Sequence, residues 1–428
     1  MSNRSPAIAI ALAVLMSGGA AQAYEANAKE AILVDITGHR VLYEKSADEH
    51  MPTSSMSKMM TIYMVFDALK AGKIHLDDEF TVSEHAWRQT YKQDESSMFL
   101  PINGRVKVED LIRGVIIQSG NDATVVLAEG IGGSEQQFME ELNEKAKQIG
   151  LSDSHFVNPH GMPDPNHYST ARDLATLAER LVVDFPEYYH FFGELEYTYN
   201  NIKQGNRNPL LYHAGSGADG LKTGHTDAGG YGLTGSAIRE GRRLIVVVNG
   251  LPSMQARADD PQALLDYGFN EFKAYTLFKP GETVEKVTTW QGVQPSVALT
   301  TDQPIAVTLS SVERKGLKAI VKMPETVKAP IAQGQEVGKL VVSVPGQPDT
   351  EYPLRTAAAV DRLGFFPRIG MAIGYTLGGK PEAPKPEPEE KKPAAEKAPP
   401  KPVPPSSAAR KMPLPDAATP PAAAPKPN

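Results

Sequence analysis

The chain has 428 residues, of which 41% are hydrophobic and 22% are charged. This is the composition of a folded protein with two or three domains. The absence of cysteine excludes a thiol nucleophile, a thiolate zinc site and any disulfide. The formal net charge of −7 and the aromatic share of 7% argue against nucleic-acid binding, which needs a basic surface and stacking side chains.

The first 23 residues predict an export signal peptide. A basic start at Arg4 precedes the apolar run 6–16, and residues 21–23 form an A-x-A cleavage pattern. The apolar run is too short to span a bilayer comfortably. We therefore expect a mature chain that begins at Tyr24 in the periplasm.

The C-terminal end predicts a different kind of segment. In residues 380–428, 16 of 49 residues are proline, which predicts an extended, disordered tail without a core. The preceding segment, 359–379, fits either a short amphipathic membrane anchor or a hydrophobic stretch packed on the domain before it. Its apolar residues recur at helical spacing: Phe366, Ile369, Ile373 and Leu377.

Between these ends, residues 24–278 mix strand and helix patterns, and residues 279–358 carry short runs broken by Gly and Pro. We expect an α+β domain in which an antiparallel sheet is covered by helices, followed by a small all-β sandwich. The predicted strands lie at 31–36, 40–43, 221–223, 232–238 and 244–248, and the predicted helices at 58–69, 122–129, 136–149, 171–183 and 261–272.

The first candidate site contains Ser55 and Lys58, which are three residues apart. With Thr53 or Ser54 as a helix cap, both side chains would share one helical face. A serine needs a base to become a nucleophile, and a lysine can serve when burial or another cation lowers its pKa. An ordinary capped helix with a solvated lysine would show the same spacing. The apolar neighbours that would bury the lysine are Met51, Met56, Met59 and Met60.

Two further motifs carry polar side chains suited to the same chemistry. Ser119 would shuttle a proton and Asn121 would hold an amide, although a simple helix cap also explains this run. On a predicted strand, Lys222 would supply a second cation, Thr223 would donate to a carboxylate, and Gly224 would let a substrate approach the backbone. A strand that ends in a glycine turn is the alternative.

The motifs S-x-x-K, S-x-N and K-T-G each occur once and in this order, which is typical of serine β-lactamases and penicillin-binding proteins. The chain resembles the low-molecular-weight penicillin-binding proteins of the serine-type D-alanyl-D-alanine carboxypeptidase family, peptidase S11. The resemblance extends from about residue 29 to about residue 366. It includes the runs 96–101, 111–114, 118–123, 169–173, 204–208 and 219–226.

The resemblance implies a role for each motif residue. Ser55 would be the acylated nucleophile and Lys58 its general base. Ser119 would relay the proton to the leaving amine, and Asn121 would hold the substrate amide. Lys222 would add the positive potential that keeps the base neutral.

By the same resemblance, the substrate is bound along the K-T-G strand. The backbone N–H groups of Ser55 and His225, beside Gly224, would form the oxyanion hole, and Thr223 and Arg257 would bind the terminal carboxylate. Two supporting residues would shape the site from behind: His160 and Asp173. We expect no metal and no cofactor.

The expected reaction is removal of the terminal D-alanine from peptidoglycan stem pentapeptides through an acyl-enzyme, with β-lactam antibiotics as covalent inhibitors. We expect a periplasmic enzyme, with peripheral contact to the outer face of the inner membrane through 359–379. A DD-endopeptidase that cuts cross-links and an inactive wall-binding scaffold remain alternatives. A class A β-lactamase would need an E-x-x-x-N segment, but Met139 stands four residues before Asn143.

Overall fold

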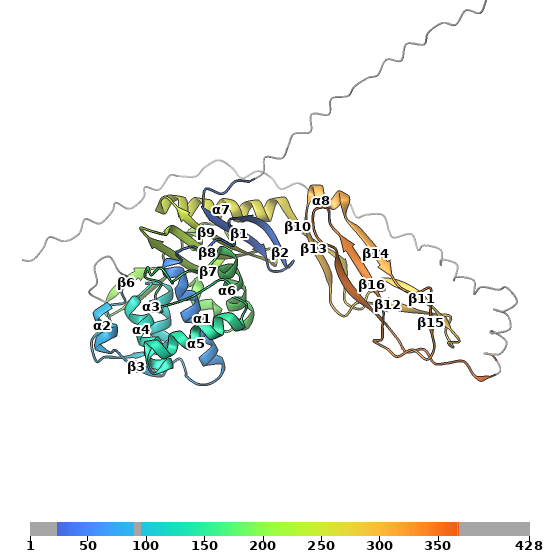
Figure 1. Ribbon diagram of the computed structural model, residues 1–428, viewed down its shortest axis with the longest axis horizontal. Helices are drawn as coiled ribbons and strands as arrows, with labels where there is room; N and C mark the ends of the chain where they lie inside the picture. Colours follow the sequence, from blue (N-terminus) through green and yellow to red (C-terminus); the bar gives the residue numbers. More distant parts are fainter. Residues whose placement is uncertain (1–23, 90–95, 366, 368–428) are drawn as a thin grey trace, which may run out of the picture. The chain divides into compact units, whose positions relative to one another are not determined.

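The computed structural model describes residues 24–89, 96–365 and 367 (Figure 1). The expected signal peptide and proline-rich tail lie outside these residues, as does most of the expected anchor segment. Up to Gly364 the chain forms one compact unit. No helix in the described part is long and apolar enough to cross a membrane.

A five-stranded antiparallel sheet with strand order β2-β1-β9-β8-β7 frames the first domain. The strands predicted from the sequence are confirmed, and β7 lies at one edge of this sheet. In the central strand, Ile245 and Val247 face one apolar core, while Val246 and Val248 face another. The strands are β1 (Glu30–Asp35), β2 (Arg40–Lys45), β7 (Ala218–Thr226), β8 (Gly230–Arg239) and β9 (Arg242–Leu251).

Helices cover both faces of this sheet, so the predicted α+β architecture is confirmed. Figure 1 shows α7 on one side and the cluster that contains α1 and α3–α6 on the other. The helices are α1 (Lys58–Lys70), α2 (Glu84–Gln89), α3 (Val108–Ile116), α4 (Asn121–Gly132), α5 (Glu135–Gln148), α6 (Ala171–Asp184) and α7 (Met254–Glu271). Smaller elements are β3 (Glu79–Thr81), β4 (Arg105–Lys107), β5 (Glu196–Tyr199), β6 (Ile202–Gly205), η2 (Tyr189–Gly193) and η3 (Pro209–Tyr212).

Helix α1 begins at Lys58 as predicted, but Ser55 does not lie in its first turn: it lies in a 3₁₀ segment, η1 (Ser54–Ser57). The Thr53 hydroxyl caps no backbone group and instead bonds to the Ser57 hydroxyl at 2.5 Å. Helix α7 begins before Pro261, because Ser253 caps its first turn and the proline is accommodated inside the helix.

The second domain consists of β-strands and one short helix, so the all-β prediction is confirmed except at α8. A six-stranded sheet has the order β14-β16-β17-β12-β11-β15, and β10 pairs with β13. β10 lies before residue 279, where this domain was expected to begin. The elements are β10 (Phe272–Phe278), β11 (Glu285–Trp290), β12 (Ser296–Thr300), β13 (Ile305–Ser310), α8 (Ser311–Gly316), β14 (Lys318–Lys322), β15 (Thr326–Lys328), β16 (Glu336–Ser343) and β17 (Thr350–Thr356).

The start of the expected anchor segment belongs to this second domain. Val360 pairs with Ile331 and is part of the domain's apolar core. The backbone N–H of Leu363 donates to the Gln291 carbonyl at 2.9 Å. Residues 360–363 therefore complete the β domain, and any separate anchor begins after them.

Candidate active site

The S-x-x-K and S-x-N motifs meet around the amine of Lys58. Its Nζ lies 2.9 Å from Ser55 Oγ, 2.7 Å from Asn121 Oδ1 and 2.6 Å from the carbonyl oxygen of His160. These partners come from η1, the first residue of α4 and the loop before α6. Lys58 is fully buried, and the four methionines expected to enclose it are buried as well. Three distant segments of the chain thus converge on one amine.

The turn before α4 presents Ser119 in an unusual conformation. Ser119 has a φ of 60°, in the left-handed region, and its buried hydroxyl has no hydrogen-bond partner among the described residues. Asp122 does not act as a simple cap, because its carboxylate accepts from the backbone N–H groups of Met98 and Leu100. This carboxylate fastens the loop 96–100 beside the S-x-N turn.

The K-T-G motif lies on the edge strand β7, where Lys222 and Thr223 are buried. A Cβ atom on Gly224 would lie 2.9 Å from the Thr53 carbonyl oxygen and 3.1 Å from Ser54 Cβ. The glycine therefore allows the η1 segment, which carries Ser55, to pack closely against β7. This protein contact explains the glycine without a substrate.

Cations surround the K-T-G lysine. Burial lowers the pKa of Lys222 well below its ordinary value, and repulsion from Lys58, Arg207 and Arg257 lowers it further. Burial also lowers the pKa of Arg257, whose guanidinium lies 5.4 Å from the centre of the Tyr231 ring. This arrangement would attract a carboxylate.

Arg207 was not singled out from the sequence, although it lies within the run 204–208 that resembles the family. Its Nη1 donates to Ser96 Oγ at 2.5 Å, and its charge acts on Lys222. Only the structure shows that this loop residue reaches the K-T-G strand. A local pattern of one arginine between asparagines gives no such signal.

The other predicted residues lie around the serine–lysine pair without contributing a side chain to it. His225 is exposed on β7, with its ring centre 4.0 Å from that of Tyr231. His160 contributes its carbonyl oxygen to the Lys58 amine. Asp173, in the first turn of α6, accepts from the backbone N–H of Asp153 at 2.9 Å and from a neighbouring serine hydroxyl, and burial raises its pKa.

A second histidine that sequence reasoning passed over supports the turn beneath Ser55. His167 Nδ1 accepts from the backbone N–H of Val157 at 3.2 Å, which leaves Nε2–H to donate to Ser57 Oγ at 2.7 Å. Ser57 Oγ in turn bonds to Thr53 Oγ1. Burial lowers the pKa of His167 to about 4. The neutral imidazole thus ties together both ends of the turn that carries Ser55.

The histidines of this region do not gather as ligands. Within the described ranges, no group of three His, Asp or Glu side chains is placed to hold a metal ion. The chemistry available to these residues is that of hydroxyl, amine and guanidinium groups. A partly buried serine beside a fully buried lysine, with cations nearby, is suited to acyl transfer on a substrate that ends in a carboxylate.

The fold and this cluster define the class of penicillin-binding serine enzymes, and comparison with known proteins gives the family. Residues 17–253 match the D-alanyl-D-alanine carboxypeptidase family, and residues 272–362 match the C-terminal domain of penicillin-binding protein 5. The chain belongs to the D-alanyl-D-alanine carboxypeptidase family S11, as the resemblance predicted.

Individual relatives cover both domains. The chain is 37% identical to the D-alanyl-D-alanine carboxypeptidase DacA of Haemophilus influenzae, over 82% of this chain and 90% of the relative. It is 39% identical to the D-alanyl-D-alanine carboxypeptidase DacC of Escherichia coli, over 81% of this chain and 88% of the relative. The crystal structure of penicillin-binding protein 5 from Haemophilus influenzae is similar, with a TM-score of 0.71 and 38% sequence identity. The match covers 79% of this chain and 99% of that structure's chain.

Proposed function

We propose that this protein is a serine-type D-Ala-D-Ala carboxypeptidase, which removes the terminal D-alanine from peptidoglycan stem pentapeptides. The observation that carries the proposal is the 2.9 Å contact between the buried Lys58 amine and Ser55 Oγ. The similarity to D-alanyl-D-alanine carboxypeptidases over about four fifths of the chain supports the same reaction.

The contacts of Lys58 suit it to act as a base. Asn121 Oδ1 and the His160 carbonyl oxygen carry no hydrogen, so each can only accept from the amine. A neutral amine has two N–H groups for these two acceptors and one lone pair. In the structure the amine also donates to Ser55 Oγ. When the amine is neutral, its lone pair can instead take the proton of Ser55 Oγ, which activates the serine as a nucleophile.

The acylation step balances with these groups alone. Ser55 Oγ attacks the carbonyl carbon of the penultimate D-alanine, and its proton moves to Lys58 Nζ. The bond to the terminal D-alanine nitrogen breaks, and the Ser119 hydroxyl, which has no hydrogen-bond partner among the described residues, relays this proton from Lys58 Nζ to that nitrogen, so the amine is neutral again. The backbone N–H groups of Ser55 and His225 stabilise the oxyanion, and water then hydrolyses the ester to restore the serine.

The cations of the site favour a substrate that carries a carboxylate. The charges of Arg207 and Arg257 act on Lys222 of the K-T-G motif, and Thr223, the next residue, would donate to the terminal carboxylate. Asn121 would hold the substrate amide. This arrangement supports a peptide that ends in a carboxylate, and β-lactams, which present a carboxylate beside a reactive amide, are the expected covalent inhibitors.

We infer the location of the enzyme from the sequence pattern at its ends. Residues 1–23 would direct export and be removed, which places the mature enzyme in the periplasm beside its substrate. Residues beyond Leu363 would provide a peripheral attachment to the outer face of the inner membrane. Deleting residues 364–379 and measuring the membrane-bound fraction tests the attachment.

The first test of the reaction is D-alanine release from a pentapeptide ending in D-Ala-D-Ala. Release should occur with the mature protein, vanish in Ser55→Ala and persist in Ser54→Ala, whose hydroxyl bonds only to Thr226. A folded protein that binds penicillin covalently but releases no D-alanine would favour an endopeptidase acting on cross-links. Neither release nor covalent labelling would favour a scaffold.

A further inference from the structure

The turn at residues 158–162 presents two successive carbonyl oxygens to helix α1. The Pro159 carbonyl accepts from the Thr61 hydroxyl at 2.6 Å, and the His160 carbonyl accepts from the Lys58 amine at 2.6 Å. Lys58 and Thr61 are three residues apart on α1, so their side chains share one helical face, and both are fully buried. The turn therefore contacts α1 along the face that carries the base.

The side chain of Asn158 closes this turn. Its Oδ1 accepts from the backbone N–H groups of Gly161 at 2.7 Å and Met162 at 3.1 Å, and its Nδ2 donates to the Met162 carbonyl oxygen at 3.0 Å. An asparagine before a proline favours a turn, because its side chain can take the place of a backbone partner. Since these bonds join the two sides of Pro159 and His160, they fix the direction of both carbonyls.

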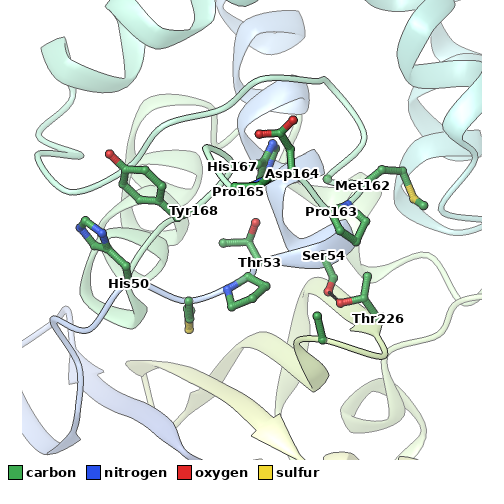
Figure 2. A pocket seen from close by; sticks show the side chains of 14 residues that line it. His50, Thr53, Ser54, Met162, Pro163, Asp164, Pro165, His167, Tyr168 and Thr226 are labelled. Atoms are coloured by element: carbon green, nitrogen blue, oxygen red, sulfur yellow. Dashed lines mark hydrogen bonds between the residues drawn. The ribbon is translucent and has the colours of Figure 1, made fainter.

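The turn also packs against the segment that carries the nucleophile. Gly161 has a φ of 83°, in the left-handed region, and a Cβ atom on it would overlap the Ser54 carbonyl oxygen. Ser54, Gly161 and Met162 line one pocket (Figure 2). A displaced turn would therefore disturb the backbone beside Ser55 together with the acceptor of the base.

We propose that Asn158 is a positioning residue for the acylation step, and that it acts on Lys58 through the His160 carbonyl. The closed turn holds this carbonyl at one N–H of the amine, so that the lone pair of the neutral amine is directed at Ser55 Oγ. With the turn open, that N–H would turn toward Ser55 Oγ and the lone pair would point away. The inference rests on the proposed carboxypeptidase function and adds to it a residue outside the three motifs.

The experiment measures acylation by a fluorescent penicillin over a range of concentrations. This separates the rate constant of the covalent step from the affinity of the complex that precedes it. Asn158→Ala should lower the rate constant by about 10-fold and change the affinity by less than about 2-fold, because the orientation of the base matters only for proton transfer. In Asn158→Ser the hydroxyl can still accept from the turn, so the loss should shrink to about 3-fold.

Asn143→Ala is the matched control. Asn143, on α5, is half-buried like Asn158, and it also forms three hydrogen bonds with backbone groups. Two of these bonds hold Phe156, at the start of the same loop and before the turn. Asn143→Ala should therefore lower the midpoint of thermal unfolding as Asn158→Ala does, but it should change the rate constant of acylation by less than about 2-fold.

An equal fall of the rate constant in Asn158→Ala and Asn143→Ala would overturn the proposal, because Asn158 would then only support the loop. A folded Asn158→Ala with an unchanged rate constant, or with a loss confined to the affinity, would also overturn it. If Asn158→Ala does not fold, the test is carried by Asn158→Ser, in which an unchanged rate constant would have the same meaning. Wild-type protein that is not acylated at all would instead overturn the proposed function.

Discussion

The two domains bury different kinds of polar side chain. The first domain encloses the charged or ionisable groups Lys58, Lys222 and Arg257 beside two apolar cores. In the described part of the second domain, the buried polar residues are all threonines: Thr289, Thr301, Thr308 and Thr356. Burying an ionisable group is costly unless it is hydrogen-bonded or paired, and such costly groups gather at functional sites. The contrast assigns chemistry to the first domain and a supporting role to the second.

Replacing the buried amine tests this contrast most strongly. Lys58→Met keeps the side-chain length and removes the base, so acylation by a fluorescent penicillin should fall by about 10³-fold. Thermal unfolding should show a loss of stability of about 1–3 kcal/mol, because Asn121 Oδ1 and the His160 carbonyl oxygen lose the hydrogen bonds that the amine donates to them. Lys70→Met, at the exposed end of the same helix, is the control. Normal acylation in Lys58→Met would remove this lysine from the mechanism.

A core substitution in the second domain should have the opposite pattern. Leu299 is fully buried in the apolar core of the β domain, so Leu299→Ala should lower the free energy of unfolding by about 2–5 kcal/mol. The acylation rate of the folded protein should not change. Val293→Ala, at an exposed position, should change the stability by less than about 0.5 kcal/mol. A parallel loss of acylation in Leu299→Ala would show that the β domain takes part in catalysis.

Protonation of His167 should weaken the first domain selectively. Its pKa falls from 6.5 to about 4 on folding, so the unfolded chain binds the extra proton between these values. Stability from the neutral imidazole is complete above pH 6.5 and is lost as the pH falls toward 4, by about 3 kcal/mol. The charged or titratable groups that act on it are Asp164, which raises its pKa, and His155 and Lys58, which lower it.

Urea unfolding at pH 7, 5.5 and 4 would measure this loss. His167→Gln keeps a donor and an acceptor without a titrating group, so its stability should vary less with pH than that of the wild type. The acylation rate should likewise vary less with pH in His167→Gln than in the wild type, because the imidazole holds the turn that carries Ser55. Identical pH profiles for the two proteins would show that this histidine does not titrate during unfolding.

The sequence predicts those features of the fold and the site that depend on patterns of neighbouring residues. Alternation and helical spacing locate the strands and helices, and the three motifs identify Ser55, Lys58, Asn121 and Lys222. The start of α1 at Lys58 is predicted correctly, but the 3₁₀ turn before it is not, because the Thr53 hydroxyl bonds to the Ser57 hydroxyl instead of capping a helix. The placement of Arg207 and His167 depends on loops that meet only in the fold, so no spacing rule reveals it.

The smallest expected effect concerns an ion pair between the first domain and the β domain. Glu313, in the short helix α8, forms an ion pair with Arg40 on β2 at 2.6 Å. Burial raises the pKa of Glu313, but the hydrogen bonds from Arg40 and Ser310 outweigh it and lower the pKa to about 2. The ion pair therefore contributes stability above pH 4.5, and this contribution is lost as the pH falls toward 2. Glu313→Gln should cost about 1 kcal/mol at pH 7, since both side chains are only partly buried.

That cost should be much smaller near pH 2, where about half of the wild-type carboxyl groups are themselves protonated. Lys339 and Glu351 form a comparable ion pair within the β domain alone, so Glu351→Gln is the matched control. If the first and second domains unfold in separate transitions, Glu313→Gln should lower the midpoint of both, because Arg40 and Glu313 lie in different domains, whereas Glu351→Gln should affect only the second. An effect of Glu313→Gln confined to the second transition would mean that the ion pair supports α8 and does not couple the domains.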